Sequence, residues 1–175
     1  LEDAYRVDFN YRLVAAREDY FQARLTTAHG PLGTSDYLIL VEAVAVGSSQ
    51  TFLHLTYSYT QSFLGRLALR TYLATVGSGK VGFTRLNPPE DELPRFIAGM
   101  RGLMERNTMR YYLAIDAYLG AVAAPPPERL EKRLREWFAA TERYARQLHE
   151  IDQNDYLTMK RKEVRQQESH TAPAS

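Results

Sequence analysis

Residues 77–82, Gly-Ser-Gly-Lys-Val-Gly, match the spacing G-x-G-x-x-G, in which glycines let a backbone loop bind the phosphates of a dinucleotide. That chemistry requires a strand directly before the glycines and a helix directly after them. Here a helical pattern precedes them, and residues 83–94, with their prolines, cannot form a helix. A P-loop is excluded as well, because Ala74 stands in place of its first glycine and Val81 in place of its Ser or Thr. We interpret the segment as the end of a helix.

The histidines give no metal-binding pattern. His149-Glu150 lacks the second histidine that a zinc protease carries four residues later, so we predict no metal and no cofactor. Glu42 and His54 are the one acid–imidazole pair that strand geometry brings together. No nucleophile accompanies them, and we interpret them as a cross-strand pair on a partly solvated face. The four histidines are dispersed over a loop, a strand, a helix and the tail: His29, His54, His149 and His170.

Polar residues interrupt the apolar stripe of the helix predicted over residues 93–122. Asn107 and Tyr111 lie on the stripe, with Arg106 and Arg110 beside them. Such groups are costly to bury unless they are hydrogen-bonded. They form either a structural polar network that ties the helix to tyrosines of a sheet, or the polar floor of an apolar cavity.

Tyrosine is unusually frequent, with 12 tyrosines against one tryptophan. Tyrosines provide apolar walls with hydroxyl groups, as ligand cavities need, and they serve a partly hydrated core equally well. Both interpretations stay open. The tyrosines that share the inferred inner face of the sheet are Tyr5, Tyr11, Tyr37, Tyr57 and Tyr59.

An antiparallel sheet must position these side chains. Alternating apolar and polar residues, separated by polar or glycine-containing turns, predict about four strands. Several helices follow, with a break at the prolines 125–127, so the fold class is α+β. The strands are predicted over residues 5–16, 20–28, 36–46 and 50–60, and the helices over residues 63–76, 93–122, 128–151 and 154–167.

Turn length fixes the strand register. A three-residue turn at residues 47–49 pairs Val46 with Gln50, and every further pair follows from that one. The first hairpin places Arg12 opposite Arg24, a like-charge pair that argues mildly against its register. The second hairpin pairs Tyr37 with Tyr59, Ile39 with Tyr57, Val41 with Leu55 and Ala43 with Leu53 on the inner face, and Glu42 with His54 and Val44 with Phe52 on the outer face.

The expected organisation is a core domain of sheet and long helix over residues 1–124, a helical appendage over residues 125–168 and a disordered tail over residues 169–175. Residues 154–167 are highly charged and have little apolar surface to bury. We therefore expect them to project from the domain or to pack against another chain.

Composition limits the function classes. The 175 residues carry 22 Lys and Arg against 21 Asp and Glu, which gives no electrostatic case for nucleic acid. The absence of cysteine excludes disulfides and thiolate metal sites. The longest apolar runs, such as residues 38–41, are far shorter than the roughly 20 residues of a membrane span, so no transmembrane segment is expected.

Three stretches, residues 29–37, 80–84 and 105–115, look like those of a family of uncharacterised proteobacterial proteins. Its members look exported with an upstream leader, which would make this protein periplasmic. The predicted architecture resembles the helix-grip fold of START-like, polyketide-cyclase-like domains. That fold opens with a strand and two short helices, so the resemblance implies a member truncated at its N-terminus.

We expect non-catalytic binding of a hydrophobic or amphipathic, lipid-like small molecule between the sheet and the helix over residues 93–122. The alternative is an interaction subunit that docks onto a larger assembly through residues 128–168. An enzyme is a third hypothesis, for which no catalytic constellation is present. The predicted ligand-binding residues are Phe9, Tyr11, Tyr57, Tyr59, Met104, Asn107 and Tyr111.

Overall fold

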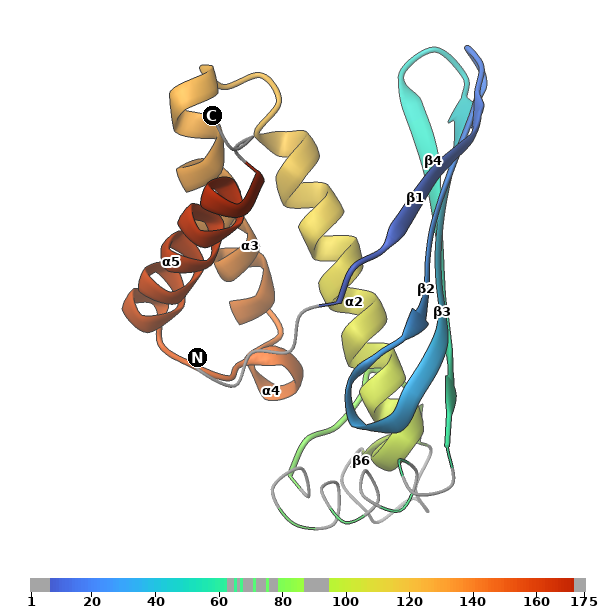
Figure 1. Ribbon diagram of the computed structural model, residues 1–175, viewed down its shortest axis with the longest axis vertical. Coiled ribbons are helices and arrows are strands. Elements are labelled where there is room, and N and C mark those ends of the chain that lie inside the picture. The colour runs from blue at the N-terminus through green and yellow to red at the C-terminus, as the bar shows by residue number, and fades with distance from the viewer. Residues whose placement is uncertain are drawn as a thin grey trace. The chain divides into compact units, whose positions relative to one another are not determined.

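The computed structural model describes residues 7–62, 79–86 and 95–171, together with Gly65, Leu67, Thr71 and Thr75 (Figure 1). The chain forms two compact units, Leu1–Gly79 and Lys80–Ser175, which we call the sheet unit and the helical unit. This boundary differs from the division expected at residue 124. The long helix groups with the helices that follow it, because the chain folds back on itself after the prolines.

The sheet unit contains a four-stranded antiparallel sheet in the order β1-β2-β3-β4, so the α+β fold predicted from the sequence is confirmed. A one-turn 3₁₀ helix, η1 (Pro31–Gly33), joins the second and third strands. The first strand begins at Asn10, later than predicted, and residues 5 and 6 lie outside the described residues. The strands are β1 (Asn10–Ala16), β2 (Tyr20–His29), β3 (Thr34–Val46) and β4 (Gln50–Gln61).

The predicted register of the β3–β4 hairpin is confirmed from the turn as far as Leu38, which lies opposite Ser58. Between Leu38 and Ser35 the register shifts by one residue, so that Asp36 and Tyr37 together lie opposite Tyr59. The cause is a β-bulge at Asp36, whose positive φ of 52° departs from the extended conformation.

The β1–β2 hairpin has the predicted pairing of Arg12 with Arg24. Its register shifts between Leu13 and Ala15, which makes Val14 the extra residue of a second bulge. A like-charge pair is therefore tolerated on the outer face, where both side chains are exposed.

The two faces of the sheet differ in burial. Ile39 is buried and its inner-face neighbours are half-buried, whereas Phe52 and His54 on the outer face are exposed. Tyr11, although on the inner face, is 63% exposed. The inner-face residues of β3 and β4 with this partial burial are Tyr37, Val41, Leu53, Leu55 and Tyr57.

The helical unit begins with two short paired strands and continues with four helices. α2 begins six residues later than predicted, because Arg95 and Phe96 pair with Leu86 and Arg85 as a strand. The helix predicted over residues 128–151 ends after Glu142, and a short helix follows it. The elements are β5 (Arg85–Leu86), β6 (Arg95–Phe96), α2 (Gly99–Gly120), the 3₁₀ turn η2 (Pro126–Glu128), α3 (Arg129–Glu142), α4 (Ala145–Leu148) and α5 (Gln153–Thr171).

Two further expectations from the sequence, about the C-terminal tail and about residues 63–76, differ from the structure. α5 continues through Thr171, so residues 169–171 are helical and do not belong to a disordered tail. The helix expected over residues 63–76 lies mostly outside the described residues. Of its described members, Leu67 was expected to be buried and is 56% exposed.

The core of the helical unit lies among α2, α3, α4 and α5. Leu113, Ala140 and Leu148 form one buried cluster. In a second cluster, Leu134 of α3 packs against Tyr156 and Leu157 of α5. The expectation that residues 154–167 project from the domain or pack against another chain is therefore wrong for the first half of α5, whose adjacent Tyr156 and Leu157 bury it against α3.

The buried face of α2 differs from the predicted stripe. Its most buried residues are Gly102, Arg106, Leu113 and Ala117, whereas Leu119 of the predicted stripe is 60% exposed. Small residues on this face allow neighbouring segments to approach closely. Among the described helices, none combines the length and the hydropathy that a membrane span needs.

Candidate functional site

The predicted sheet residues gather around Tyr37. The rings of Tyr37 and Tyr59 stack with centroids 5.1 Å apart, Tyr57 lies 6.2 Å from Tyr37, and Phe9 meets it edge-on at 6.3 Å. Gly30 permits this packing, because a Cβ atom there would collide with the Tyr37 ring. Burial, and then the neighbouring Tyr37, raise the pKa of Tyr59. The Tyr59 hydroxyl thus stays protonated, and the cluster is an apolar surface with hydroxyl groups at its edge.

The Glu42–His54 pair lies on the outer face as predicted, with 3.1 Å between His54 Nδ1 and Glu42 Oε2. β2 adds two donors that the sequence did not reveal. Tyr20 Oη donates to Glu42 Oε1 at 2.7 Å and Gln22 Nε2 donates to it at 3.2 Å. The bond from Tyr20, followed by that with His54, lowers the pKa of Glu42. A carboxylate held by three donors is a poor proton acceptor, which favours the cross-strand interpretation.

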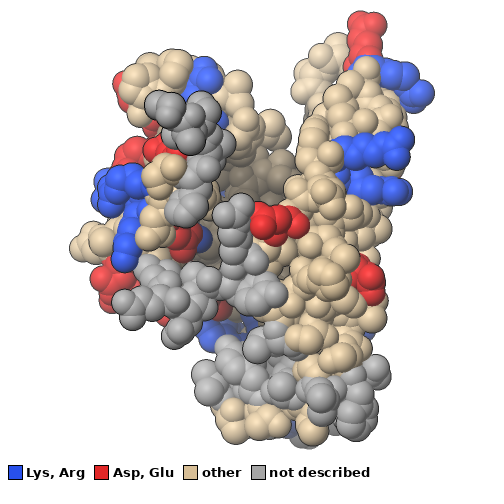
Figure 2. All heavy atoms as spheres, viewed as in Figure 1, with Lys and Arg blue, Asp and Glu red and all other residues tan. Residues whose placement is uncertain are grey.

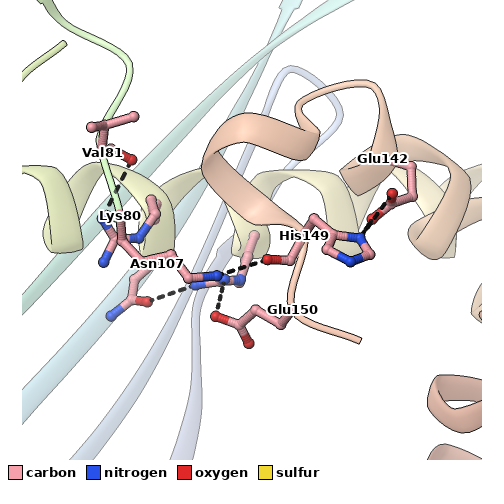
Figure 3. Close-up of polar contacts among 8 residues, drawn as sticks. Lys80, Val81, Asn107, Glu142, His149 and Glu150 are labelled. Carbon is pink, nitrogen blue, oxygen red and sulfur yellow. Dashed lines mark hydrogen bonds and ion pairs between the residues drawn. The ribbon is translucent and has the colours of Figure 1, made fainter. Parts of the chain in front are cut away.

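The polar segment of α2 forms a network within the helical unit (Figure 3). Arg110 donates to Asn107 Oδ1 at 3.4 Å and to Glu150 Oε1 at 2.6 Å. Arg106 is only 3% exposed and donates to the carbonyl oxygen of Val81 at 3.3 Å. The network therefore fastens α2 to residue 81 and to the segment between α4 and α5.

In the motif over residues 77–82, Lys80 forms a hydrogen bond and Gly82 packs closely against α2. Lys80 Nζ donates to the carbonyl oxygen of His149 at 2.7 Å (Figure 3). A Cβ atom at Gly82 would lie 2.8 Å from the Cα atom of Gly102, so the loop and α2 meet backbone to backbone. Residues 77 and 78 lie outside the described residues. From Gly79 onward, the motif provides close packing and hydrogen bonds.

The Glu105 carboxylate binds the loop that follows. Its Oε2 accepts from the backbone N–H groups of Phe83 at 2.7 Å and Thr84 at 2.9 Å, and its Oε1 accepts from Thr84 Oγ1 at 2.6 Å. Burial alone would raise the pKa of Glu105, but these hydrogen bonds together lower it. Glu105 thus carries its charge in order to hold residues 83 and 84 against α2.

A cavity of about 640 Å³ opens among α2, α3, α5 and the segment joining α4 to α5. Such a volume lies within the range of small-molecule sites, roughly 300–1,000 Å³. Most of its walls are apolar or aromatic. The lining residues are Arg110, Tyr111, Ala114, Ala117, Arg133, Leu134, Trp137, Phe138, Thr141, Glu142, Leu148, Glu150, Ile151, Tyr156, Met159 and Lys160.

Three aromatic side chains shape the cavity wall. Trp137 stacks on Tyr156 with ring centroids 5.0 Å apart, and Phe138 lies 5.4 Å from Tyr156. Trp137 Nε1 donates to the carbonyl oxygen of Arg110 at 3.3 Å, which fixes the indole between α3 and α2. Burial, and then the Glu163 carboxylate, raise the pKa of Tyr156 to about 12. Tyr156 is thus a neutral wall residue with one hydroxyl donor.

Most charged groups at the cavity have partners. Besides the Arg110–Glu150 pair, Lys160 Nζ lies 2.7 Å from Glu163 Oε2, and Glu142 lies 3.0 Å from His149 Nδ1. Next to Lys160, Arg161 binds α5 to α3 by donating from Nε and Nη2 to the two carboxylate oxygens of Glu131. On the face that Figure 2 shows, basic and acidic side chains accordingly lie next to each other over the helical unit.

The predicted ligand-binding residues belong to both units. Tyr111 lines the cavity of the helical unit, whereas Met104 and Asn107 are half-buried on the same helix outside its lining. The combination of these three with Phe9, Tyr11, Tyr57 and Tyr59 in one site stays a prediction. The sequence gave no sign that α5 would complete a cavity with Leu134, Trp137 and Phe138 of α3.

Comparison with known proteins finds no matching family model, curated protein or solved structure. The resemblance to START-like domains and to an exported bacterial family therefore stays a prediction. In the part of the chain that the structure describes, no group of three His, Asp or Glu side chains is placed to hold a metal ion.

Proposed function

We propose that the protein binds a small apolar or amphipathic molecule, without chemical change, in the cavity of its helical unit. The observation that carries the proposal is a 640 Å³ cavity whose walls combine Trp137, Phe138 and Tyr156 with aliphatic side chains. Ligand sites pair such walls with a small number of placed polar groups. The proposal keeps the ligand class expected from the sequence and assigns it to four helices of one unit.

Trp137 makes the proposal directly testable, because it is the single tryptophan of the chain and lines the cavity. Titration with decanol, a neutral amphiphile, should change the intensity and wavelength of Trp137 emission in a saturable manner. The same titration followed by calorimetry gives an affinity that does not depend on the fluorophore.

Ala114→Phe should weaken decanol binding about tenfold, because a ring in the cavity excludes roughly two methylene groups of the ligand. Ala114 is exposed on α2 and lines the cavity, so the fold can accept the substitution. The matched control is Ala139→Phe, at an exposed alanine of α3 outside the lining, which should leave affinity unchanged. Absence of saturable binding, or equal affinity in wild type and Ala114→Phe, would refute the proposal.

The interaction subunit is a second proposal, since the range 128–168 exposes large apolar side chains. Leu130, Tyr144 and Ile151 are each 37–38% exposed. Single apolar side chains are common on protein surfaces, so this second proposal depends on direct detection of a partner. Native mass spectrometry of the protein isolated from its own source distinguishes the proposals: a bound small mass supports the first, and a stoichiometric second polypeptide supports docking.

A further inference from the structure

The cavity has one cation whose hydrogen-bonding capacity the described protein leaves unused. Arg110 and Lys160 at the cavity are paired with Glu150 and Glu163. Arg133 forms no hydrogen bond or ion pair with any described residue, and its Nε atom is buried without a partner. A buried donor left unsatisfied is unfavourable, and native proteins rarely keep one without a reason.

The contact that Arg133 does make leaves its donors available. Its Cζ atom lies 4.0 Å above the centre of the Tyr118 ring. A cation over a ring face is held by the π-electrons, while the N–H bonds of a guanidinium point outward in its own plane. Tyr118 therefore holds the guanidinium without accepting a conventional hydrogen bond from it, and a guanidinium fork matches a carboxylate geometrically.

Arg133 and Glu142, which both line the cavity, lie well apart along α3. α3 runs back along α2, since Arg133 contacts Tyr118 while Trp137 contacts Arg110. Glu142 lies nine positions beyond Arg133 on α3, a rise of about 13 Å. Glu142, whose carboxylate lies 3.0 Å from His149 Nδ1, is therefore far along α3 from the unpaired Arg133.

We propose that the ligand is an amphiphile with an anionic carboxylate-like head, which Arg133 binds through its N–H groups. The apolar body then lies along Leu134, Trp137 and Tyr156, toward the opposite end. This inference rests on the proposed function, because it specifies the ligand class of the same cavity. Decanoate is the natural probe, since it differs from decanol only in its head.

Wild-type protein should bind decanoate at least about tenfold more tightly than decanol, as expected for a charge-assisted hydrogen bond in a half-buried site. Arg133→Gln should abolish this preference and leave decanol affinity within about threefold. Arg133→Lys should retain part of it, because the charge remains and the planar fork is lost. The matched control is Arg135→Gln, an exposed arginine of α3 outside the cavity, which should keep the full preference.

Trp137 emission reports binding in every variant, and circular dichroism verifies the helices. Decanol binding without a preference for decanoate would overturn the inference and leave the proposed function standing. So would a preference that survives Arg133→Gln. Failure of both probes to bind would overturn the inference and the proposed function together. If Arg133→Gln does not fold, the test uses the wild type and Arg133→Lys. A preference for decanoate over decanol in the wild type that is reduced in Arg133→Lys supports the inference, and an unreduced preference overturns it.

Discussion

Glu105 offers a direct test of how α2 is fastened to the loop before it. Two substitutions separate the parts of its role. Glu105→Ala removes the acceptor of two backbone N–H groups, those of Phe83 and Thr84. Glu105→Gln keeps one carbonyl oxygen for these donors and removes the charge, and the Thr84 hydroxyl must then accept instead of donating.

The magnitudes follow from the hydrogen bonds. A bond to a charged group contributes about 1.5–3 kcal/mol, and we take the lower value for a partly hydrated site. The Glu105 side chain is 20% exposed, so water reaches part of it. Glu105→Ala should therefore lower the free energy of unfolding by about 3 kcal/mol, and Glu105→Gln by about 1 kcal/mol.

Urea unfolding followed by Trp137 fluorescence measures these values in the helical unit, which contains the chain's single tryptophan. The folded-state pKa of Glu105 is lowered, so its contribution is present above the ordinary carboxyl value of about 4.3 and is lost as the pH falls through the folded pKa. The difference between wild type and Glu105→Gln should shrink accordingly in acid. Glu136→Gln, at an exposed i,i+4 pair, is the control and should change stability by less than about 0.5 kcal/mol. An equal loss for Ala and Gln, or a Gln deficit that persists in acid, would refute the reasoning.

Two further outcomes are expected. Gly82→Ala should destabilise the helical unit by about 1–3 kcal/mol, because its Cβ atom would meet the Gly102 backbone at 2.8 Å. Gly120→Ala, which would meet only the flexible end of Glu136, should be neutral or stabilise by up to about 1 kcal/mol in the same urea titration, and a reversed order would contradict the packing. Tyr20→Phe should raise the Glu42 pKa toward its ordinary value, so that the pH-dependent stability contributed by the Glu42 carboxylate becomes smaller. An NMR titration of the Glu42 carboxyl measures this, and an unchanged pKa would show that the Tyr20 hydrogen bond is not its cause.

The sheet was predictable because a short turn and a two-residue period leave little freedom. Pairing Val46 with Gln50 fixed the β3–β4 register over most of the hairpin. The two bulges were not predictable in this way. A single extra residue at Val14 or Asp36 leaves the apolar pattern on either side intact, and only three-dimensional pairing reveals it.

The helices were harder to predict, because small residues define much of their packing. The sequence analysis singled out large side chains on α2, such as Met104 and Tyr111. The structure instead buries Gly102 and Ala117, where another segment can approach closely. Adjacent apolar residues caused the second error: Tyr156 and Leu157 form no visible stripe, yet both are buried. Because the packing of α5 against α3 was not foreseen, the cavity that these helices line was not foreseen either. The sequence therefore predicted Tyr111 as a site residue but did not predict Arg133.

The polar segment of α2 divides along the helix into two parts with different tasks. Glu105 and Arg106 bind the loop over residues 81–84, next to the Gly82–Gly102 contact. From Arg110 onward, one face of α2 lines the cavity instead. One turn thus fixes the position of the helix, and the following turns are free to shape a binding surface. Substitutions of Glu105 or Arg106 should therefore change stability, and under the proposed function a substitution of the cavity-lining Tyr111 should change binding.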